Sequence, residues 1–333
     1  MSLNFKEPHI IRATYRIVTP MFIGDANQNT TDGVRPPSVK GALRFWWRAL
    51  SWGKFQGMSA SEALKALNLE EARLFGAAMN AEKVTGGQGV FLLSIQQDIA
   101  SQQKVYDWPP EKKPEHGASF MAYGLLGEGD DDHRGAIIEG TEFSLKLVFN
   151  PKRMVDGDVA EIEKTLEAWS LFGGLGGRSR RGMGSVTQIS LNGENTLLTK
   201  ASYQDRVEAL LGDYSEVSTS PYTAFSKDSV HRTVDSNRKA REALTKTGSR
   251  YKEFRSTLKG QSFAKAGFGL PLKEFGDEKQ RRASPLIFHV HELENESFTT
   301  AMIYLPSSQF HFDEKYSGIK IDKVAEFARG SAV

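Results

Sequence analysis

The segment FGGLGGRSRRGMGSV, Phe172–Val186, contains six glycines among fifteen residues. Glycine at this density indicates backbone angles, or close approaches between chain segments, that other residues do not permit. A helical pattern over Val159–Phe172 precedes the segment, and a strand pattern over Ser185–Leu191 follows it. Phosphate-binding glycine loops run in the opposite order, from a strand to the N-terminus of a helix. The segment also matches neither GxxxxGK[ST] nor GxGxxG, since no Lys follows it and Ser179 stands at the third glycine position.

The elements around this segment predict the fold of the first half of the chain. They are strands at His9–Val18, Gly89–Gln96 and Glu142–Phe149, helices at Val39–Ser51 and Ser61–Ala78, and a hairpin around Phe120–Leu126. Two consecutive strand–helix–strand units are the order of a ferredoxin-like α+β domain. We therefore predict one such domain over residues 1–195, with an insertion at about 98–140 and a glycine-rich loop at 173–184.

The second half, residues 196–333, has a less regular pattern. It contains a basic region at 227–265, which we expect to be partly helical. Its other predicted elements are helices at Tyr203–Leu211 and Ile321–Phe327 and strands at Pro285–His291 and Phe298–Leu305. This order favours a second, degenerate ferredoxin-like domain, so the predicted fold class is α+β with two such domains.

The composition of the 333-residue chain excludes several classes of protein. It has no cysteine, which excludes disulfide frameworks, thiolate metal sites and cysteine nucleophiles and fits a reducing compartment. No apolar run approaches the roughly 18 residues of a membrane span, and the N-terminus shows no signal-peptide pattern. We therefore expect a cytoplasmic protein with no membrane partner.

The formal net charge of +2 argues at first against a nucleic-acid partner, but the charge is segregated along the chain. Residues 33–61 carry +5 and residues 168–193 carry +3, both without a single acid. The basic region carries +7, which leaves −13 for the rest of the chain. Clustered cations create a local positive field whatever the total charge. A solvated helix face remains the alternative for each window by itself.

The helix predicted at Val39–Ser51, with Ser38 as its N-cap, has two stripes. An apolar stripe predicts the buried face, and a second stripe, Lys40, Arg44 and Arg48, has no acid among its residues. Cations beside aromatic rings are typical of grooves that bind single-stranded nucleic acid. We expect Trp46 to lie in the core and Trp47 to be the stacking candidate. A solvated helix face is the competing interpretation.

The glycine-rich loop carries Arg178, Arg180 and Arg181. Because the loop follows a helix C-terminus, the arginines could simply complement the helix dipole. One or two cations suffice for that effect, however, and three arginines on a glycine loop favour contact with phosphate oxygens.

Enzymatic patterns are weak in this chain. His289 and His291 share one strand face without a third metal ligand, and Asp130–Asp132 with His133 is foremost an acidic loop. The sequence therefore predicts no catalytic set, no metal and no cofactor.

Four motifs, in order along the chain, resemble those of the RAMP superfamily of CRISPR systems, and within it the largest RAMP subunit of type III-B (Cmr) effector complexes. They are TPMFIG (Thr19–Gly24), RPPSVKGALRFWWR (Arg35–Arg48), LFGGLGGRSRRG (Leu171–Gly182) and RRASPL (Arg281–Leu286). The resemblance implies two ferredoxin-like, RRM-related domains. It also implies a non-catalytic subunit that contacts guide RNA and target RNA near the 3′ end of the guide, beside other Cmr subunits.

The residues that the resemblance and the charge pattern together mark for RNA binding are Lys40, Arg44, Trp47, Arg48, Arg178, Arg180 and Arg181, then Arg35 and Arg282. The loop glycines are Gly173, Gly174, Gly176, Gly177, Gly182 and Gly184. Two alternatives stay open. One is a guide-processing endoribonuclease using His133, His231 or His311, because other RAMP proteins cut repeat RNA; the other is a protein scaffold without RNA contact.

Overall fold

The computed structural model describes residues 7–24, 30, 32–80, 85–98, 104–105, 108–109, 116–125, 135–272, 280–310, 316, 318–319 and 321–330. Within these ranges the chain is a mixed α+β protein with antiparallel sheets. Asp130–Asp132, His133 and His311 lie outside them, as does much of the insertion predicted at 98–140.

The first sheet has five strands in the order β4-β7-β1-β8-β9, all antiparallel. Its strands are β1 (Ile10–Ile17), β4 (Phe91–Gln96), β7 (Glu142–Phe149), β8 (Val186–Leu191) and β9 (Glu194–Asn195). Alternating burial along β1 and β7 turns one face toward the helices, as a period of two requires. Two small two-stranded sheets pair β2 (Gly76–Asn80) with β3 (Thr85–Gln88) and β5 (Lys104–Val105) with β6 (Ala136–Ile137).

The helices of the first half are α1 (Pro36–Ser51), followed by a 3-10 turn (Trp52–Phe55), then α2 (Ala60–Phe75), α3 (Gly117–Met121) and α4 (Asp158–Phe172). The prediction of Ser38 as N-cap is wrong: α1 begins three residues earlier than predicted, at Pro36, with Arg35 as N-cap. Proline fits the first turn of a helix because its fixed φ is helical and its missing N–H would have no partner there. Ser59 and Glu62 form a capping box that begins α2.

The hairpin predicted around Phe120–Leu126 is also wrong, because residues 117–121 form α3, which packs against α6 (Ala240–Thr257). Gly117 and Gly248 meet at this crossing, and a Cβ on either would collide with the backbone of the other helix. The conformation of residues 117–121 therefore depends on the contact with α6, which is distant in the sequence.

The second sheet has three antiparallel strands in the order β10-β12-β11. They are β10 (Val230–Asn237), β11 (Leu286–Leu293) and β12 (Ser297–Tyr304), and the remaining helices are α5 (Lys200–Gly212), α7 (Ser262–Ala266) and α8 (Asp322–Arg329). The basic region at 227–265 holds both β10 and α6, so the expectation of partial helicity is confirmed.

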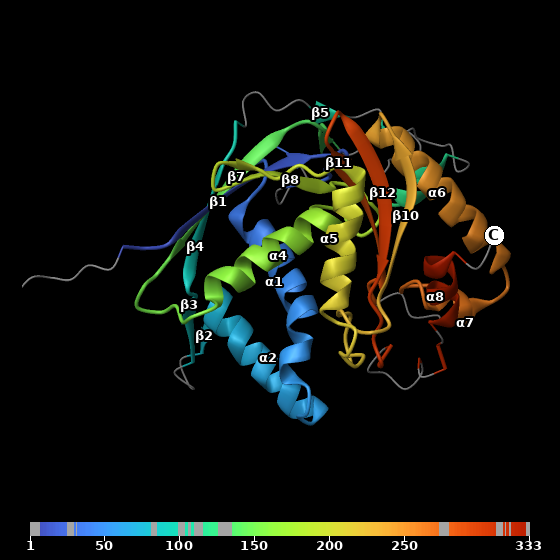
Figure 1. Ribbon diagram of the computed structural model, residues 1–333. Coiled ribbons are helices and arrows are strands. Elements are labelled where there is room, and N and C mark those ends of the chain that lie inside the picture. The colour runs from blue at the N-terminus through green and yellow to red at the C-terminus, as the bar shows by residue number, and fades with distance from the viewer. Residues whose placement is uncertain are drawn as a thin grey trace, which may run out of the picture.

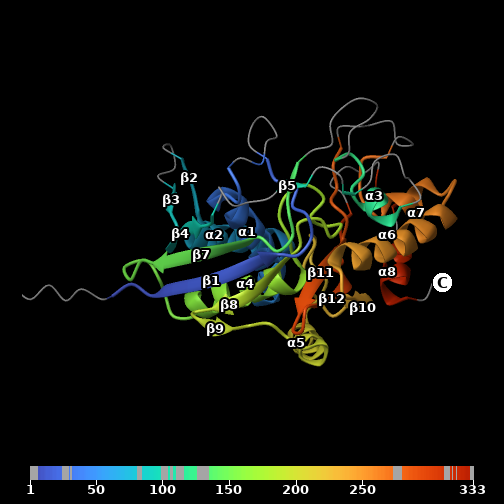
Figure 2. The same ribbon diagram turned by 90° about the horizontal axis from the view of Figure 1, so that it is seen from above.

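Helix α4 lies between the two sheets and contacts β8 on one side and β11 and β12 on the other. Figure 1 shows it crossing the middle of the molecule, while α6 and α8 cover the far face of the second sheet and α7 lies beside α8. The view from above in Figure 2 shows the two sheets side by side, with α5 against the second. One buried cluster includes residues of both sheets, such as Tyr15 and Ile303, so the two halves share a core.

Candidate nucleic-acid interface

The glycine-rich loop, residues 173–184, is held in place by its own backbone. The Gly177 N–H donates to the Phe22 carbonyl oxygen at 2.7 Å. Gly176 has a φ of +85°, and a Cβ there would overlap the same carbonyl oxygen. A side chain at this position would push the loop off the segment before it, so the glycine is required for the close approach. The loop is therefore a fixed platform for its arginines.

The three loop arginines point in two directions. Arg178 and Arg181 donate to carbonyl oxygens beside α3, at 2.7 Å to Tyr123 and 3.2 Å to Phe120. Arg178 itself has a φ of +58°, which is unusual for a residue other than glycine. Arg180 instead packs toward α1. The loop thus presents its positive charge on two sides.

Arg180 is the most enclosed of the three. Its guanidinium carbon lies 4.5 Å from the ring centre of Phe45, and its Nη1 donates to the Ser284 carbonyl oxygen at 2.6 Å. Burial, and after it the charge of Arg282, lower the pKa of Arg180 to about 10. The group still carries its proton at neutral pH. Among the described residues it has no carboxylate partner, so its charge is not neutralised by the protein.

Arg282, 102 residues further along the chain, faces the same region. It donates from Nε to the Phe310 carbonyl oxygen at 2.6 Å and from Nη2 to the Ser307 hydroxyl at 2.6 Å. Burial also lowers the pKa of Arg282. The ion pairs of the described residues include none with Arg282, so two partly buried cations lie near one another without an acid. Such an arrangement favours an anionic ligand.

The basic stripe of α1 differs from its prediction. Arg48 contacts both carboxylate oxygens of Glu71 at 2.8 Å, and Arg44 contacts the same group at 3.2 Å. The acid comes from α2, which packs against α1, so inspection of one helix alone could not reveal it. Arg44 also donates to the Gly76 carbonyl oxygen. Glu71 thus neutralises one of the two positive charges inside the protein, and the three groups together stay net positive.

The other two predicted cations lie at the start of α1. Lys40 sits 5.8 Å from the Phe91 ring centre, and burial, then the charge of Arg44, lower its pKa. Arg35 is exposed, donates to the Gly24 carbonyl oxygen at 3.1 Å, and lies 4.0 Å from Asp32. Neither reaches the Arg180–Arg282 pair through a contact that the structure records.

The assignment of Trp47 as a stacking residue is wrong. Its side chain is only 1% exposed, and its indole N–H donates to Glu161 of α4 at 3.0 Å. Helix α1 is covered by α2 and α4, so its buried arc is wider than the apolar stripe alone predicts. Trp46 is 3% exposed, which confirms its assignment to the core. The half-buried ring near the cations is instead that of Phe45, which sequence reasoning passed over beside three tryptophans.

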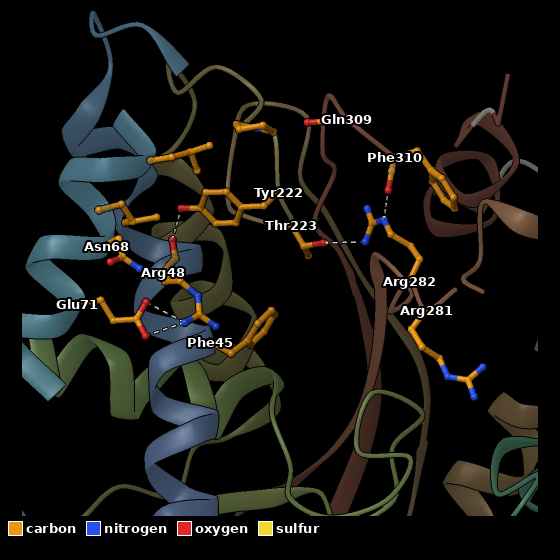
Figure 3. A pocket seen from close by; sticks show the side chains of 13 residues that line it. Phe45, Arg48, Asn68, Glu71, Tyr222, Thr223, Arg281, Arg282, Gln309 and Phe310 are labelled. Atoms are coloured by element: carbon orange, nitrogen blue, oxygen red, sulfur yellow. Dashed lines mark hydrogen bonds and ion pairs between the residues drawn. The ribbon is translucent and has the colours of Figure 1, made fainter. Parts of the chain in front are cut away.

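Phe45 forms the wall between two cavities. The smaller, of about 310 Å³, is bounded by the glycine-rich loop and contains Arg180 and Ser38. The larger, of about 670 Å³, is lined by Phe45, Arg48, Leu64, Leu67, Asn68, Glu71, Pro221, Tyr222, Thr223, Arg281, Arg282, Gln309 and Phe310. Figure 3 shows α1 and α2 forming one wall of the larger cavity and the segments with Tyr222, Arg282 and Phe310 forming the other. We call the two cavities together the Phe45 groove.

Three histidines lie inside the core, and none of them lines the groove. His289 and His291 approach to 3.4 Å between Nε2 and Nδ1, and His231 contacts the Tyr203 ring from β10. Burial lowers the pKa of His231 and of His291 to about 4 and holds that of His289 well below its usual value. Over the described ranges, no group of three potential ligands could hold a metal ion.

In the part of the chain that the structure describes, every helix is too short or too polar to cross a bilayer.

The chain is similar to known proteins in sequence and in structure. A family model described as the RAMP superfamily matches residues 14–187. A curated protein, the CRISPR system Cmr subunit Cmr1-1 of Pyrococcus furiosus, is 28% identical over 304 residues, which cover 84% of this chain and 82% of that protein.

Two solved structures share the fold over nearly the whole chain. The apo crystal structure of Cmr1 from Pyrococcus furiosus superposes with a TM-score of 0.64 at 22% identity, covering 97% of both chains. A chain in the cryo-EM structure of the type III-B Cmr-beta complex bound to cognate target RNA gives 0.61 at 12% identity, covering 97% of this chain and 98% of that one.

Proposed function

The chain belongs to the RAMP superfamily, and from that premise we propose that it is a non-catalytic, RNA-binding subunit of a type III-B (Cmr) RNA-guided complex. Its partners would be guide RNA, target RNA and other Cmr subunits. In such complexes base pairing reads the sequence, while the protein reads the RNA backbone and its shape. A similar fold occurs in a complex described as bound to target RNA, which supports the proposal.

The observation that carries the proposal is the Arg180–Arg282 pair in the Phe45 groove. Both guanidinium groups are oriented by carbonyl oxygens rather than by carboxylates, so they keep their full charge. Backbone carbonyls hold the geometry without supplying an anion, and phosphate oxygens are well suited to complete such a site. The half-buried Phe45 ring beside them offers an apolar surface to a base.

The proposal extends to the fold, as two ferredoxin-like halves. The sequence β1, α1, β4, β7, α4, β8 and the sheet order β8-β1-β7-β4 correspond to the first. The second sheet has the order β10-β12-β11 with α6 and α8, which lacks one strand of the pattern among the described residues. This would be the degenerate half. A position near the 3′ end of the guide rests on the family resemblance alone.

The test is the salt dependence of RNA binding by the full chain. We expect the R180A/R282A variant to bind a single-stranded RNA more weakly, with the slope of log K against log salt reduced by about 1.4, since each phosphate contact on a single strand contributes about 0.7. Fluorescence anisotropy between 50 and 300 mM salt measures both quantities. An R180K/R282K variant keeps the charge and loses the planar fork, so it should retain most of the slope.

The matched control removes two cations that already have acids. Lys164 of α4 contacts Asp213, the residue after α5, at 2.7 Å. Arg206 of α5 contacts Glu167 of α4 at 3.0 Å. The K164A/R206A variant should bind RNA with an unchanged slope. If both double variants behave alike, the groove does not bind the RNA backbone, and a scaffold role becomes the better explanation.

The endoribonuclease alternative stays untested. Of its three candidate histidines, His231 is enclosed in the core with a pKa near 4, whereas His133 and His311 lie outside the described residues. Incubation of labelled repeat RNA with the full chain, without metal, would reveal cleavage. Cleavage lost on a single histidine substitution would overturn the non-catalytic assignment.

A further inference from the structure

We infer that the larger cavity of the Phe45 groove takes in one unstacked base of a bound single-stranded RNA, so that the strand turns out of a continuous stack at this point. The inference rests on the proposed function and adds to it a specific base-binding pocket. The cavity of about 670 Å³ is large enough for a whole nucleotide.

The first argument is the repeated pairing of an arginine with an aromatic ring. Arg180, which lines the smaller cavity, lies over the ring of Phe45 at 4.5 Å, and Arg282, which lines the larger cavity, lies over the ring of Phe310 at 5.1 Å. A ring with a cation against it offers a base its face and the neighbouring phosphate its charge. Figure 3 shows Phe45 and Phe310 on opposite sides of the cavity, with Tyr222 on the same side as Phe45, close to Arg48 of α1.

The second argument concerns charge inside the cavity. Glu71 is the one carboxylate among the lining residues, and Arg44 and Arg48 both contact it. The three groups together are net positive, so the acid does not repel a phosphate. The lining also contains apolar groups, including Leu64 and Leu67 of α2. A lining that combines cations with apolar groups is complementary to a nucleotide rather than to a purely apolar ligand.

The third argument is that the mouth of the cavity is accessible from α2. Asn68 is exposed on this helix and lines the cavity. Its side chain makes no hydrogen bond within the described part of the molecule, so a larger residue can replace it without breaking a contact. The next residue, Leu69, is 70% exposed and does not line the cavity. The two positions therefore provide a blocking variant and its control.

The experiment compares N68W with L69W. A tryptophan at position 68 would occupy the cavity, and we expect about tenfold weaker binding of a ten-nucleotide RNA, the order of one lost base–aromatic stack. The slope against salt should remain that of the unmodified protein, because the cations are untouched. L69W should bind as the unmodified protein does. Circular dichroism of both variants checks that they fold alike.

A photo-crosslink identifies the pocket directly. RNA containing 5-iodouridine should crosslink to peptides holding Phe45, Tyr222 or Phe310 in the unmodified protein and in L69W, and not in N68W. Equal affinity and equal crosslinking of the two variants would refute the base pocket, even if the R180A/R282A variant lowers the salt slope as proposed. If R180A/R282A instead has the salt slope of the unmodified protein, the proposed function is contradicted. The two failures are therefore distinguishable.

Discussion

Acidification should destabilise this protein through the three histidines in its core. Burial holds the pKa of His231 and of His291 near 4, and that of His289 well below its usual value. In the unfolded chain a histidine has a pKa near 6.5. As the pH falls below 6.5, the unfolded state therefore binds protons that the folded state does not bind. The stability contribution is fully present above that pH and is lost as the pH falls toward 4.

The size of the effect follows from the two pKa values. Going from pH 7 to pH 5, a histidine shifted from about 6.5 to about 4 lowers the free energy of unfolding by about 2 kcal/mol. His231 and His291 together thus remove about 4 kcal/mol, a large part of the 5–15 kcal/mol typical of a folded domain. No carboxylate contributes to the lowered pKa of these groups, so nothing compensates the added charge.

The assay is urea unfolding at pH 7, 6 and 5, followed by circular dichroism. Carboxylates titrate in every variant. The variants are therefore compared by how much free energy of unfolding each loses between pH 7 and pH 5. The H231Q/H291Q variant should lose about 4 kcal/mol less than the unmodified protein. His9 is exposed before β1, and H9Q serves as the control. Equal losses in the double variant and in the unmodified protein would refute the argument.

Three further predictions concern the stability of the fold. E71Q, which leaves two arginines that are 31% and 37% exposed without their acid, should lower stability by about 2 kcal/mol in urea unfolding; a change under about 0.5 kcal/mol would contradict this. G176A should cost about 2 kcal/mol or more because of its φ of +85° and the overlap with a carbonyl oxygen, whereas G41A, in open space on α1, should be neutral or slightly stabilising. W47F should lower stability by about 1–2 kcal/mol and leave RNA affinity unchanged; weaker RNA binding by folded W47F would restore Trp47 as a contact residue.

The sequence predicts most elements of this fold because their apolar patterns are local. The strand predicted at Glu142–Phe149 has the same bounds as β7, and the helix at Val159–Phe172 begins one residue later than α4. Strand β10 was missed, because nearly every position along it is half-buried and no alternation is visible. Its conformation comes from pairing with β12 and from packing against α6 and α8.

The candidate site was harder to predict than the fold, because it depends on contacts between residues far apart in the sequence. The acid that pairs with the α1 stripe lies on another helix, and Arg282 is 102 residues from Arg180 in the chain. Local charge counting therefore ranked Arg44 and Arg48 too high among residues free to bind a ligand, since Glu71 engages both. It also favoured Trp47 over Phe45 as the ring beside the cations. Trp47 is buried by contacts with α2 and α4 together, which the sequence of α1 alone does not reveal.

The partner of each cation separates structural charge from charge available to a ligand. A carboxylate partner both orients an arginine and neutralises positive charge, as Glu71 does for one of the two charges of Arg44 and Arg48. A carbonyl partner orients it and leaves the charge intact, as at Arg180 and Arg282. The near-zero net charge of the chain thus says little about RNA, since opposite charges that meet inside the fold cancel there first. What matters for a polyanion is where oriented cations remain without an acid, and in the described structure the Phe45 groove has two of them.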